Sequence, residues 1–289
     1  MGDFASVIGS GPIVGLDDVP NNLDAYYKIV SSSIDLNLSH HSGSNIIDAT
    51  EDSHDVRVVA GSGDDQMLGG RGDDTFIGGS GLDTIDGNAG DDVLGGGRGD
   101  DVLYGDRGDD ALFGGKGSDE LYGERGDDTL HGNEGDDSLN GFLGDDVMFG
   151  DNGSDTLNGD AGDDDLHGGR GDDNMYGGAG DDQLFGEAGS DTLIGGVGDD
   201  VLEGGTGSDA FYFSSGFGDD VIGDFGKGDQ LWLTANINNS GINNVRDVAQ
   251  YVSGDKGHTV IKIGEDSIRL DGVGKDDFLQ HLTTWVKIV

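Results

Sequence analysis

The sequence lacks several things that would otherwise define a fold or a partner. Its 289 residues include no cysteine, two prolines and 15 basic residues against 59 acidic ones. Without cysteine, neither a disulfide framework nor a thiolate metal site is available. The net charge of −44 argues against nucleic acid, and against anionic lipid unless calcium bridges the two. No run of 18 apolar residues predicts a membrane span, and residues 1–19 lack the pattern of a cleaved signal peptide.

What the sequence has in abundance is a short repeat rich in glycine and aspartate. Residues 60–212 divide into 17 blocks of nine, without insertion or deletion. In the block 69–77, Gly-Gly-Arg-Gly-Asp-Asp-Thr-Phe-Ile, the positions are numbered one to nine. Across all blocks, position four is Gly, position six is Asp, position eight is large and apolar, and position one is Gly except at Ala60. A period this short predicts a solenoid whose units stack on their neighbours.

Each block has the composition of a turn followed by a short strand. Positions one to six carry turn residues, because glycine permits positive φ and lets carbonyl groups converge. Positions seven to nine are expected to alternate out, in, out, with position eight in the core. Two blocks then close a coil of 18 residues, and coils stack at the strand spacing of ~4.8 Å.

The aspartate at position six indicates the function. The repeat carries 39 acidic and 6 basic residues, a net charge of −33, and its carboxylate rows repel one another unless cations lie between the turns. Carboxylates and glycine-turn carbonyls are hard oxygen ligands that suit Ca²⁺. If each turn shares an ion with the turn two blocks along, about 12 to 17 Ca²⁺ bind per chain. Without metal, we expect this highly charged tract to be disordered.

The candidate metal ligands are the position-six carboxylates and one further carboxylate that follows a two-residue slip of the period. They are Asp65, Asp74, Asp83, Asp92, Asp101, Asp110, Asp119, Asp128, Asp137, Asp146, Asp155, Asp164, Asp173, Asp182, Asp191, Asp200, Asp209 and Asp220.

The block Gly-Gly-x-Gly-x-Asp-x-(apolar)-x resembles the nonapeptide of the RTX, or haemolysin-type calcium-binding, family. The resemblance covers the whole of 60–212. It implies an all-β fold, a parallel β-roll, with Ca²⁺ held by the position-six Asp and by main-chain carbonyls of positions one to four. The position-four carbonyls belong to Gly63, Gly72, Gly81, Gly90, Gly99, Gly108, Gly117, Gly126, Gly135, Gly144, Gly153, Gly162, Gly171, Gly180, Gly189, Gly198 and Gly207.

Eight blocks depart from the family pattern at position two. If only the carbonyl is used there, these changes affect turn strain more than coordination. The residues are Asn88, Asp106, Glu124, Asn133, Phe142, Asp151, Asp160 and Glu187.

The regions that flank the repeat predict caps. Residues 1–24 are expected to be an irregular lead-in and 25–59 a cap of irregular strands, at 26–30, 33–38, 45–48 and 55–59. The repeat fills 60–212. Residues 213–289 are expected to form a C-terminal cap with a hairpin of 260–263 and 267–270 and a short helix at 276–282.

The RTX resemblance also implies an uncleaved C-terminal signal for a type I (ABC-transporter) secretion system. Lys287 stands where the family often has an acidic residue, so the match is partial. The tail also fits a final strand, and both roles stay open. The expected location is extracellular, for a bacterial protein secreted without a cleaved N-terminal signal peptide.

Two other motifs are explained without a functional site. His40-His41 lie beside Ser42-Gly43, with no third ligand nearby in sequence, and predict an exposed turn rather than a transition-metal site. Arg-Gly-Asp occurs five times, but always as position three followed by the repeat's own Gly and Asp. The arginines are Arg71, Arg98, Arg107, Arg125 and Arg170.

Position nine provides a candidate recognition surface, because its side chains are expected to point outward and alternate blocks share a face. One face carries Phe113, Phe149 and Phe185, with His131 and His167 between them. The other face carries Tyr104, Tyr122 and Tyr176. Such rows can bind sugars, membranes or a second roll, or can instead stabilise the sheet by stacking or be covered by the terminal domains.

Two functions remain as hypotheses. The first is a non-enzymatic, secreted calcium-binding protein that acts as a structural, matrix or surface-recognition component. The alternative is the secretion and folding module of an exported protease, lipase or epimerase. The first is favoured, since 59 residues before the repeat are too few for a catalytic domain and no His-Glu-x-x-His or Gly-x-Ser-x-Gly motif occurs. Because the sequence begins at Met1, we expect a complete chain.

Overall fold

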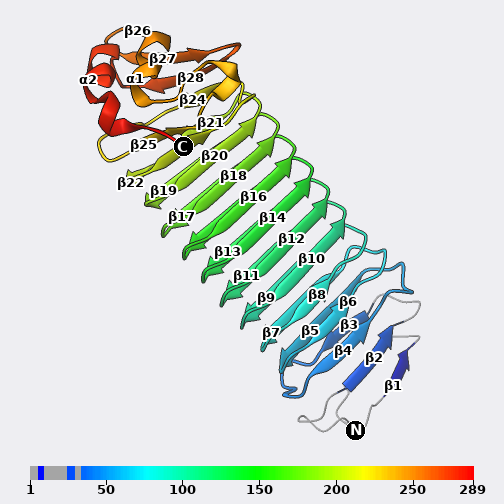
Figure 1. Ribbon diagram of the computed structural model, residues 1–289. Helices are drawn as coiled ribbons and strands as arrows, with labels where there is room; N and C mark the ends of the chain where they lie inside the picture. The colour runs from blue at the N-terminus through cyan, green and yellow to red at the C-terminus, as the bar shows by residue number, and fades with distance from the viewer. Residues whose placement is uncertain (1–5, 10–24, 30–33) are drawn as a thin grey trace. The chain divides into compact units, whose positions relative to one another are not determined.

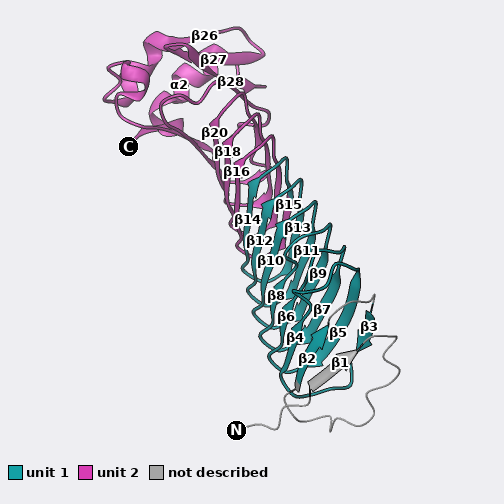
Figure 2. Ribbon diagram, turned by 90° about the vertical axis from the view of Figure 1, so that its right-hand side faces the viewer, with its two compact units in different colours: residues 1–147 teal, residues 148–289 magenta. Residues whose placement is uncertain are grey.

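The computed structural model describes residues 6–9, 25–29 and 34–289. The chain divides into two compact units, Met1–Val147 and Met148–Val289, which are described in turn (Figure 2). In both units, successive strands alternate between two sheets, so each coil contributes one strand to each sheet (Figure 1). The predicted all-β parallel β-roll is confirmed in each unit.

The first unit contains two sheets whose neighbouring strands are all parallel. One sheet runs in the order β1 (Ser6–Gly9), β2 (Ala25–Ile29), β4 (Asn45–Asp48), β6 (Gln66–Leu68), β8 (Thr84–Asp86), β10 (Val102–Arg107), β12 (Glu120–Arg125) and β14 (Ser138–Leu143). The other runs in the order β3 (Ile34–Asn37), β5 (Val56–Ser62), β7 (Thr75–Ser80), β9 (Val93–Arg98), β11 (Ala111–Lys116) and β13 (Thr129–Glu134).

The second unit continues the same alternation and ends in a small mixed region. One sheet contains β16 (Thr156–Ala161), β18 (Asn174–Ala179), β20 (Thr192–Val197), β23 (Ala210–Phe213), β25 (Gln230–Leu233) and β29 (Val286–Ile288). The other contains β17 (Asp165–Arg170), β19 (Gln183–Gly189), β21 (Val201–Glu203), β24 (Asp219–Ile222), β28 (Asp266–Asp271), β27 (His258–Ile263) and β26 (Val252–Gly254). Further elements are β15 (Val147–Asn152), β22 (Thr206–Gly207), η1 (Ile237–Asn239), α1 (Val245–Val248), η2 (Ala249–Tyr251) and α2 (Lys275–Trp285).

The strands are longer than the sequence predicted. Most span six residues, from position seven of one block to position three of the next, as in Val102–Arg107. Asp106 pairs with Glu124 and Arg107 with Arg125, so positions two and three belong to the ladder. The prediction that positions one to six are all turn is wrong for this stretch. Identical coils repeat by translation, so even a glycine-rich segment of unusual φ finds its own copy to pair with in the next coil.

The core is a stack of position-eight side chains, as predicted. Leu103, Leu112, Leu121 and Leu130 are fully buried, and so are their equivalents in the second unit. Burying one large apolar side chain contributes about 1.5–3 kcal/mol, so a single such residue per nine leaves little to offset the ordering of the glycine-rich turns.

The backbone conformation at position two explains why eight blocks can have a residue other than glycine there. All eight residues have φ between 67° and 78°, the left-handed region. Glycines at the same position, such as Gly79 and Gly115, have φ of 117° and 119°. The non-glycine residues therefore keep the turn by a modest backbone adjustment, and Asn and Asp tolerate that region best.

The strands predicted between residues 25 and 59 are present in the structure. Strands β2, β3 and β4 lie within one residue of their predicted bounds, β5 runs three residues beyond its predicted end, and the four already alternate between the two sheets. One difference concerns the lead-in: Ser6–Gly9 form β1, which pairs in parallel with β2. Four residues of Ser-Val-Ile-Gly are too short to signal a strand without that partner. The rest of 1–24 lies outside the described residues.

The C-terminal region adds coils of 20 residues and then a cap. Val201 pairs with Val221 and Ala210 with Gln230, which is the two-residue slip read from the sequence. The predicted hairpin forms between β27 and β28, and the predicted helix is α2. None of the helices within the described part of the chain is long and apolar enough to cross a membrane.

Candidate calcium sites between the turns

The position-six aspartates form two ladders within each unit, each of which links every second block. Every one of them, and Asp220, has a relative exposure of 0–3%. The main-chain N–H of Asp92 donates to Oδ1 of Asp110 at 2.7 Å, and the N–H of Asp110 donates to Oδ1 of Asp128 at 2.7 Å. In the second unit, the main-chain N–H of Asp182 donates to Oδ1 of Asp200 at 2.9 Å. One carboxylate oxygen is thus fixed by the preceding coil.

The other oxygen, Oδ2, has no hydrogen-bond donor within the described part of the chain at most of these positions. Examples are Asp92, Asp110 and Asp128 in the first unit and Asp182 and Asp200 in the second. A buried carboxylate oxygen without a donor is costly unless a cation completes its environment.

Glycine at position one keeps a space open beside that oxygen. A Cβ added to Gly105 would stand within 3.0 Å of both Oδ2 of Asp110 and the carbonyl oxygen of Gly123. The same pair of oxygens surrounds Gly177, namely Oδ2 of Asp182 and the carbonyl of Gly195. Each cradle therefore joins a carboxylate from one coil to a carbonyl from the next.

These oxygens fit a hard cation. Within residues 6–9, 25–29 and 34–289, no three Asp, Glu or His side chains converge as a metal-ligand set. Any ion between the turns would therefore take most of its ligands from main-chain carbonyls, with position-six carboxylates supplying charge. Calcium accepts six to eight oxygens in flexible geometry, which suits such a mixed set.

The electrostatics of the metal-free roll oppose a charged ladder. Burial raises the pKa of Asp92 to about 8 and that of Asp128 to about 7, and burial outweighs the main-chain hydrogen bond that each accepts. Neighbouring ladder carboxylates raise both pKa values further. In the second unit, burial raises the pKa of Asp182 to about 7 and that of Asp220 to about 8. A cation between coils would reverse this preference for the neutral form.

Position-four glycine is required by both backbone and packing. Gly108 has φ of 126°, and a Cβ there would overlap the carbonyl oxygen of Gly90 in the preceding coil. Its N–H donates to the carbonyl of Arg125 at 3.0 Å. The position-four carbonyls that the family resemblance nominates therefore stack directly on the glycine of the next coil.

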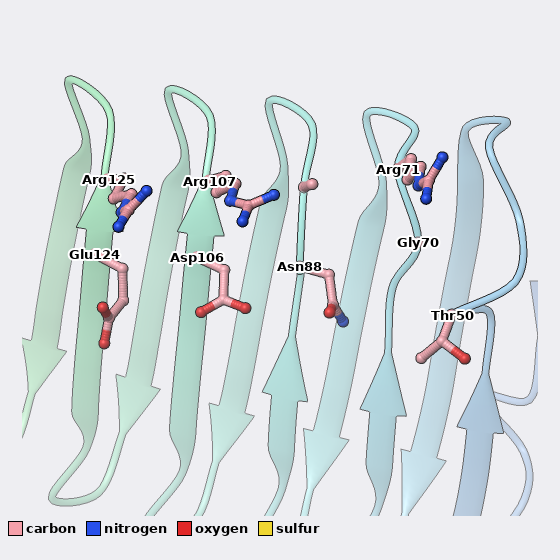
Figure 3. A pocket seen from close by; sticks show the side chains of 9 residues that line it. Thr50, Gly70, Arg71, Asn88, Asp106, Arg107, Glu124 and Arg125 are labelled. Atoms are coloured by element: carbon pink, nitrogen blue, oxygen red, sulfur yellow. The ribbon is translucent and has the colours of Figure 1, made fainter.

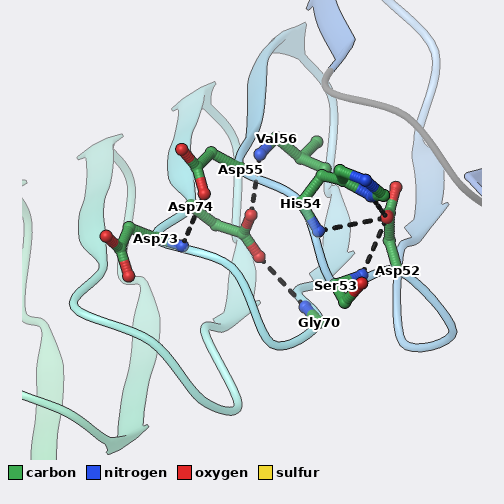
Figure 4. A network of polar contacts seen from close by, with 8 residues as sticks. All are labelled: Asp52, Ser53, His54, Asp55, Val56, Gly70, Asp73 and Asp74. Atoms are coloured by element: carbon green, nitrogen blue, oxygen red, sulfur yellow. Dashed lines mark hydrogen bonds and ion pairs between the residues drawn. The ribbon is translucent and has the colours of Figure 1, made fainter.

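Asp74 differs from the other ladder residues (Figure 4). Its Oδ1 accepts the N–H of Val56 at 2.8 Å, and its Oδ2 accepts the N–H of Gly70 at 3.0 Å. Nearby, the buried Asp52 accepts from the N–H of Ser53 and from the ring of His54. At this end of the ladder, main-chain N–H groups and an imidazole thus donate to carboxylate oxygens. In the later coils, we expect a cation to contact the corresponding Oδ2 atoms.

Position five forms a second ladder that the sequence reasoning missed. It is Asp or Ser in 16 of the 17 blocks. Oδ1 of Asp109 accepts the N–H of Asp127 at 3.0 Å, and Oδ1 of Asp163 accepts the N–H of Asp181 at 2.9 Å. Here the acceptor lies in the earlier coil, opposite to position six, and the side chains are exposed. The restriction of position five to Asp and Ser, short side chains with an oxygen acceptor, was the sequence signal that could have predicted this second ladder.

Two further residues extend the position-six ladder beyond the repeat. Oδ1 of Asp229 accepts the N–H of Asp209 at 3.1 Å, and Asp229 follows Asp220 by nine residues, a spacing that could have revealed it. At the other end, Asn45 donates from its N–H to Oδ1 of Asp65 at 2.6 Å. Asn45 carries an amide where the later coils carry a carboxylate.

The position-nine side chains form the two rows expected. Tyr104 and Tyr122 stack with ring centroids 4.9 Å apart, and in the second unit His167 stacks between Phe149 and Phe185 at 4.9 Å from each. Phe113 stacks on His131 at 5.2 Å, and Phe113 and Tyr176 are each 38% exposed. The rings therefore stack along each row, and Phe113 and Tyr176 remain partly open to solvent.

The prediction that His40-His41 form an exposed turn holds for His40 only. His41 is 5% exposed, and its carbonyl accepts the N–H of Ser62 at 2.9 Å. The turn lies against the first repeat block, so its second residue turns inward. Burial of a turn side chain by the next coil has no signal in local sequence.

A comparison with protein families agrees with this architecture. The family described as RTX calcium-binding nonapeptide repeat matches in windows at 59–94, 86–121, 95–130, 122–157, 149–184, 158–193, 176–211 and 185–222. No curated protein matches the chain. Among solved structures, the extracellular lipase LipA from Serratia marcescens is similar at 18% identity and a TM-score of 0.31, over 86% of this chain and 40% of the lipase chain. The matched windows cover more than half of the 289 residues, and the chain belongs to the RTX calcium-binding nonapeptide repeat family.

Proposed function

We propose that this calcium-binding β-roll protein is secreted, folds when calcium binds between its turns, and acts outside the cell as a structural, matrix or surface-recognition component. The observation that carries the proposal is the row of buried Oδ2 atoms, which in cradles such as those of Asp110 and Asp182 lie beside a position-one carbonyl of the next coil. The position-six aspartates listed above are the proposed ligands, together with main-chain carbonyls of positions one to four.

The proposed stoichiometry follows from the coil spacing. Sharing one ion between turns two blocks apart gives about 15 sites in 17 blocks, roughly +30 of charge against the −33 of the repeat. Asp74 is a weak candidate in this set, since main-chain N–H groups already satisfy both its oxygens. Asp65 is another, since its block has the buried Ala60 at position one where later blocks have glycine.

Folding and calcium binding are coupled in this proposal. The core contributes one large side chain per block, and without cations the buried carboxylates favour the unfolded chain at neutral pH. Extracellular modules bind calcium with Kd of ~10⁻⁴ to 10⁻³ M, far above cytosolic levels. The chain would therefore stay unfolded in the producing cell and fold outside it.

Circular dichroism tests the coupling. We expect a disordered spectrum in EDTA and a cooperative gain of β signal as Ca²⁺ approaches millimolar. Mg²⁺ should substitute poorly, because it requires a smaller and stricter octahedron. A β spectrum that is already complete in EDTA at pH 7.5 would refute the proposal.

The C-terminal region is proposed to cap the roll and to contain the type I secretion signal. Trp285 of α2 packs edge-on against Phe225 with ring centroids 5.7 Å apart, and β29 pairs with β25. Lys287 lies over the ring of Trp232 at 4.4 Å. These contacts support the capping role of the tail, and an export assay of the deletion described below tests the signal.

A groove on the first unit supports a recognition role (Figure 3). It has a volume of about 430 Å³ and is lined by Arg71, Arg107 and Arg125 at position three and by Asp106 and Glu124 at position two. Within the described part of the chain, none of the three guanidinium groups forms an ion pair with a side chain. A stacked Tyr104–Tyr122 pair lies on the same two strands.

Arginine, acid and aromatic rows together suit an acidic polysaccharide. Guanidinium groups bind carboxylate or sulfate groups, acidic side chains accept from hydroxyl groups, and flat rings pack against sugar rings. Binding of calcium-saturated protein to a polyuronate, measured by calorimetry, should be lost in the variant Arg107→Gln/Arg125→Gln. Arg170→Gln is the matched control, because position three in the adjacent coils of its face is Asn152 and Ala188. Equal binding by the double variant would refute this surface.

The enzyme-module alternative predicts a different outcome. If the chain serves only to export a catalytic domain, calcium-folded protein should bind no extracellular polymer and should not associate with itself. The same calorimetry, with sedimentation of the calcium-saturated chain, distinguishes the two functions.

A further inference from the structure

The first coil of the roll contains a cluster of buried polar atoms unlike the calcium cradles. Four side chains contribute: Tyr27, His41, Asn45 and Asp65, with relative exposures of 1%, 5%, 1% and 2%. Within the described part of the chain, the Tyr27 hydroxyl, both ring nitrogens of His41, Oδ1 of Asn45 and Oδ2 of Asp65 have no hydrogen-bond partner. Such groups are rarely buried together without something to bind.

The four side chains are gathered around the Asp65 carboxylate. Asn45 donates to Oδ1 of Asp65 from its N–H at 2.6 Å and from its Nδ2 at 2.7 Å, which leaves Oδ2 on the other side. His41 and Tyr27 each interact electrostatically with this carboxylate. Tyr27 pairs with Ile47, which lies two residues after Asn45 in the same strand. Alternate residues of a strand point to the same side of a sheet, so Tyr27 and Asn45 lie on the same face.

The regular calcium arrangement is blocked at this coil. Elsewhere, position one is glycine, and a Cβ there would stand within 3.0 Å of the Oδ2 that faces the cradle, as at Gly78 and Gly87. The first block has Ala60 at this position, and its methyl group is fully buried. Asp65 therefore cannot present the oxygen pair that the later blocks share.

The donor set also differs in chemistry. An imidazole nitrogen is a poor ligand for Ca²⁺, which takes oxygens, but it is a preferred ligand for Zn²⁺ and related divalent ions. A single carboxylate beside the imidazole supplies negative charge, and the amide and phenol oxygens complete a polar lining. No histidine within the repeat is buried in this way.

We propose that His41 and Asp65, with the oxygens of Asn45 and Tyr27 beside them, form a site for one transition-metal ion of the zinc class at the start of the roll. This site binds independently of the calcium ladder and fixes the turn 38–45 onto the first repeat block. Zinc would thus hold the N-terminal cap where the calcium arrangement cannot continue.

Zinc counting in the presence of calcium tests the proposal. The full chain, saturated with millimolar Ca²⁺, is dialysed against micromolar ZnCl₂ and analysed by atomic emission. We expect about one tightly bound Zn²⁺ per chain. His41→Gln should lose it, with at least a roughly tenfold weaker zinc affinity. His40→Gln is the matched control, since this neighbouring imidazole is exposed and should leave the count unchanged.

Cobalt provides a second readout on the unaltered protein. Co²⁺ bound through an imidazole and a carboxylate gives visible ligand-field absorption, which added Zn²⁺ should remove and added Ca²⁺ should not. This measurement keeps the test decisive even if His41→Gln fails to fold, which circular dichroism in calcium would reveal. No zinc above the level of a calcium-only control, or unchanged zinc binding by folded His41→Gln, would overturn the proposal. Calcium-driven folding is read separately by circular dichroism, so failure of the zinc site leaves the proposed calcium function intact.

Discussion

Acid should partly replace calcium in folding the roll. In the metal-free folded state, burial raises the pKa of the position-six carboxyls above the unfolded value of 3.8, to about 6 for Asp101 and about 8 for Asp92. For a carboxyl whose folded pKa is raised, the stability contribution is fully present below the unfolded pKa and is lost as pH rises through the folded pKa. The metal-free roll should therefore be more stable at pH 5 than at pH 8.

The size of the effect is large for each residue. For Asp128, the rise from 3.8 to about 7 corresponds to roughly 4 kcal/mol between the two limits. In EDTA, the β signal should increase as pH falls from 8 to 5, a range in which the unfolded chain stays negatively charged. Asp128→Asn should remove about one proton from this transition, which is ~1.4 kcal/mol per pH unit. Asp127→Asn, at the neighbouring exposed position, is the matched control variant.

Circular dichroism with urea titrations at several pH values measures both quantities, and sedimentation excludes aggregation as the source of β signal. Identical metal-free spectra at pH 5 and pH 8, or greater stability at pH 8, would refute the reasoning. The same linkage predicts that calcium binds the folded roll more weakly on acidification, because protons and calcium compete for the same oxygens.

Four further outcomes are expected. Atomic-emission analysis of dialysed, calcium-saturated protein should give about 12 to 17 Ca²⁺ per chain, and fewer than about five would contradict the proposed sites. Asp128→Ala combined with Asp146→Ala should raise the calcium midpoint and make the transition less steep, whereas an unchanged curve would argue against nearest-neighbour coupling. Gly108→Ala should cost about 2 kcal/mol or more through its φ of 126° and its overlap with the preceding coil, while Gly95→Ala, whose nearest non-neighbour atom is 3.9 Å away, should stay within about 0.5 kcal/mol. Deletion of 216–289 should stop export and weaken calcium-driven refolding, and normal behaviour in both assays would remove the capping and signal roles.

The features that repeat in every coil could be predicted from the sequence. Coils of a solenoid are related by translation, so equivalent positions in all of them have the same environment. The burial of position eight, the 18-residue coil and the slip that brings Asp220 into line with Asp200 all follow from spacing alone. The resemblance to the RTX nonapeptide supplied the nature of the roll and its metal.

What the sequence did not predict depends on contacts between coils. Positions two and three were interpreted as turn because their glycines disfavour strands, yet each pairs with its own copy one coil away. His41 was expected in solvent, since nothing local indicates that the first repeat block covers it. Asp229 was passed over because the period had already shifted once, although it again follows its predecessor by nine residues.

The alternation of blocks between two sheets limits how such a chain can change length. Tyr104 pairs with Tyr122 on one sheet, while Phe113 pairs with His131 on the other. The outer residues of each sheet therefore come from every second block of the sequence. Removing 18 residues, such as 96–113, would leave every later block of the unit on its own side. Removing nine would transfer each later block to the opposite sheet and exchange the two outer surfaces while the core and the aspartate ladders stayed in place. Duplication and loss of single blocks would therefore be nearly neutral for folding but would rewrite what the protein displays, so selection on recognition should favour changes in steps of two.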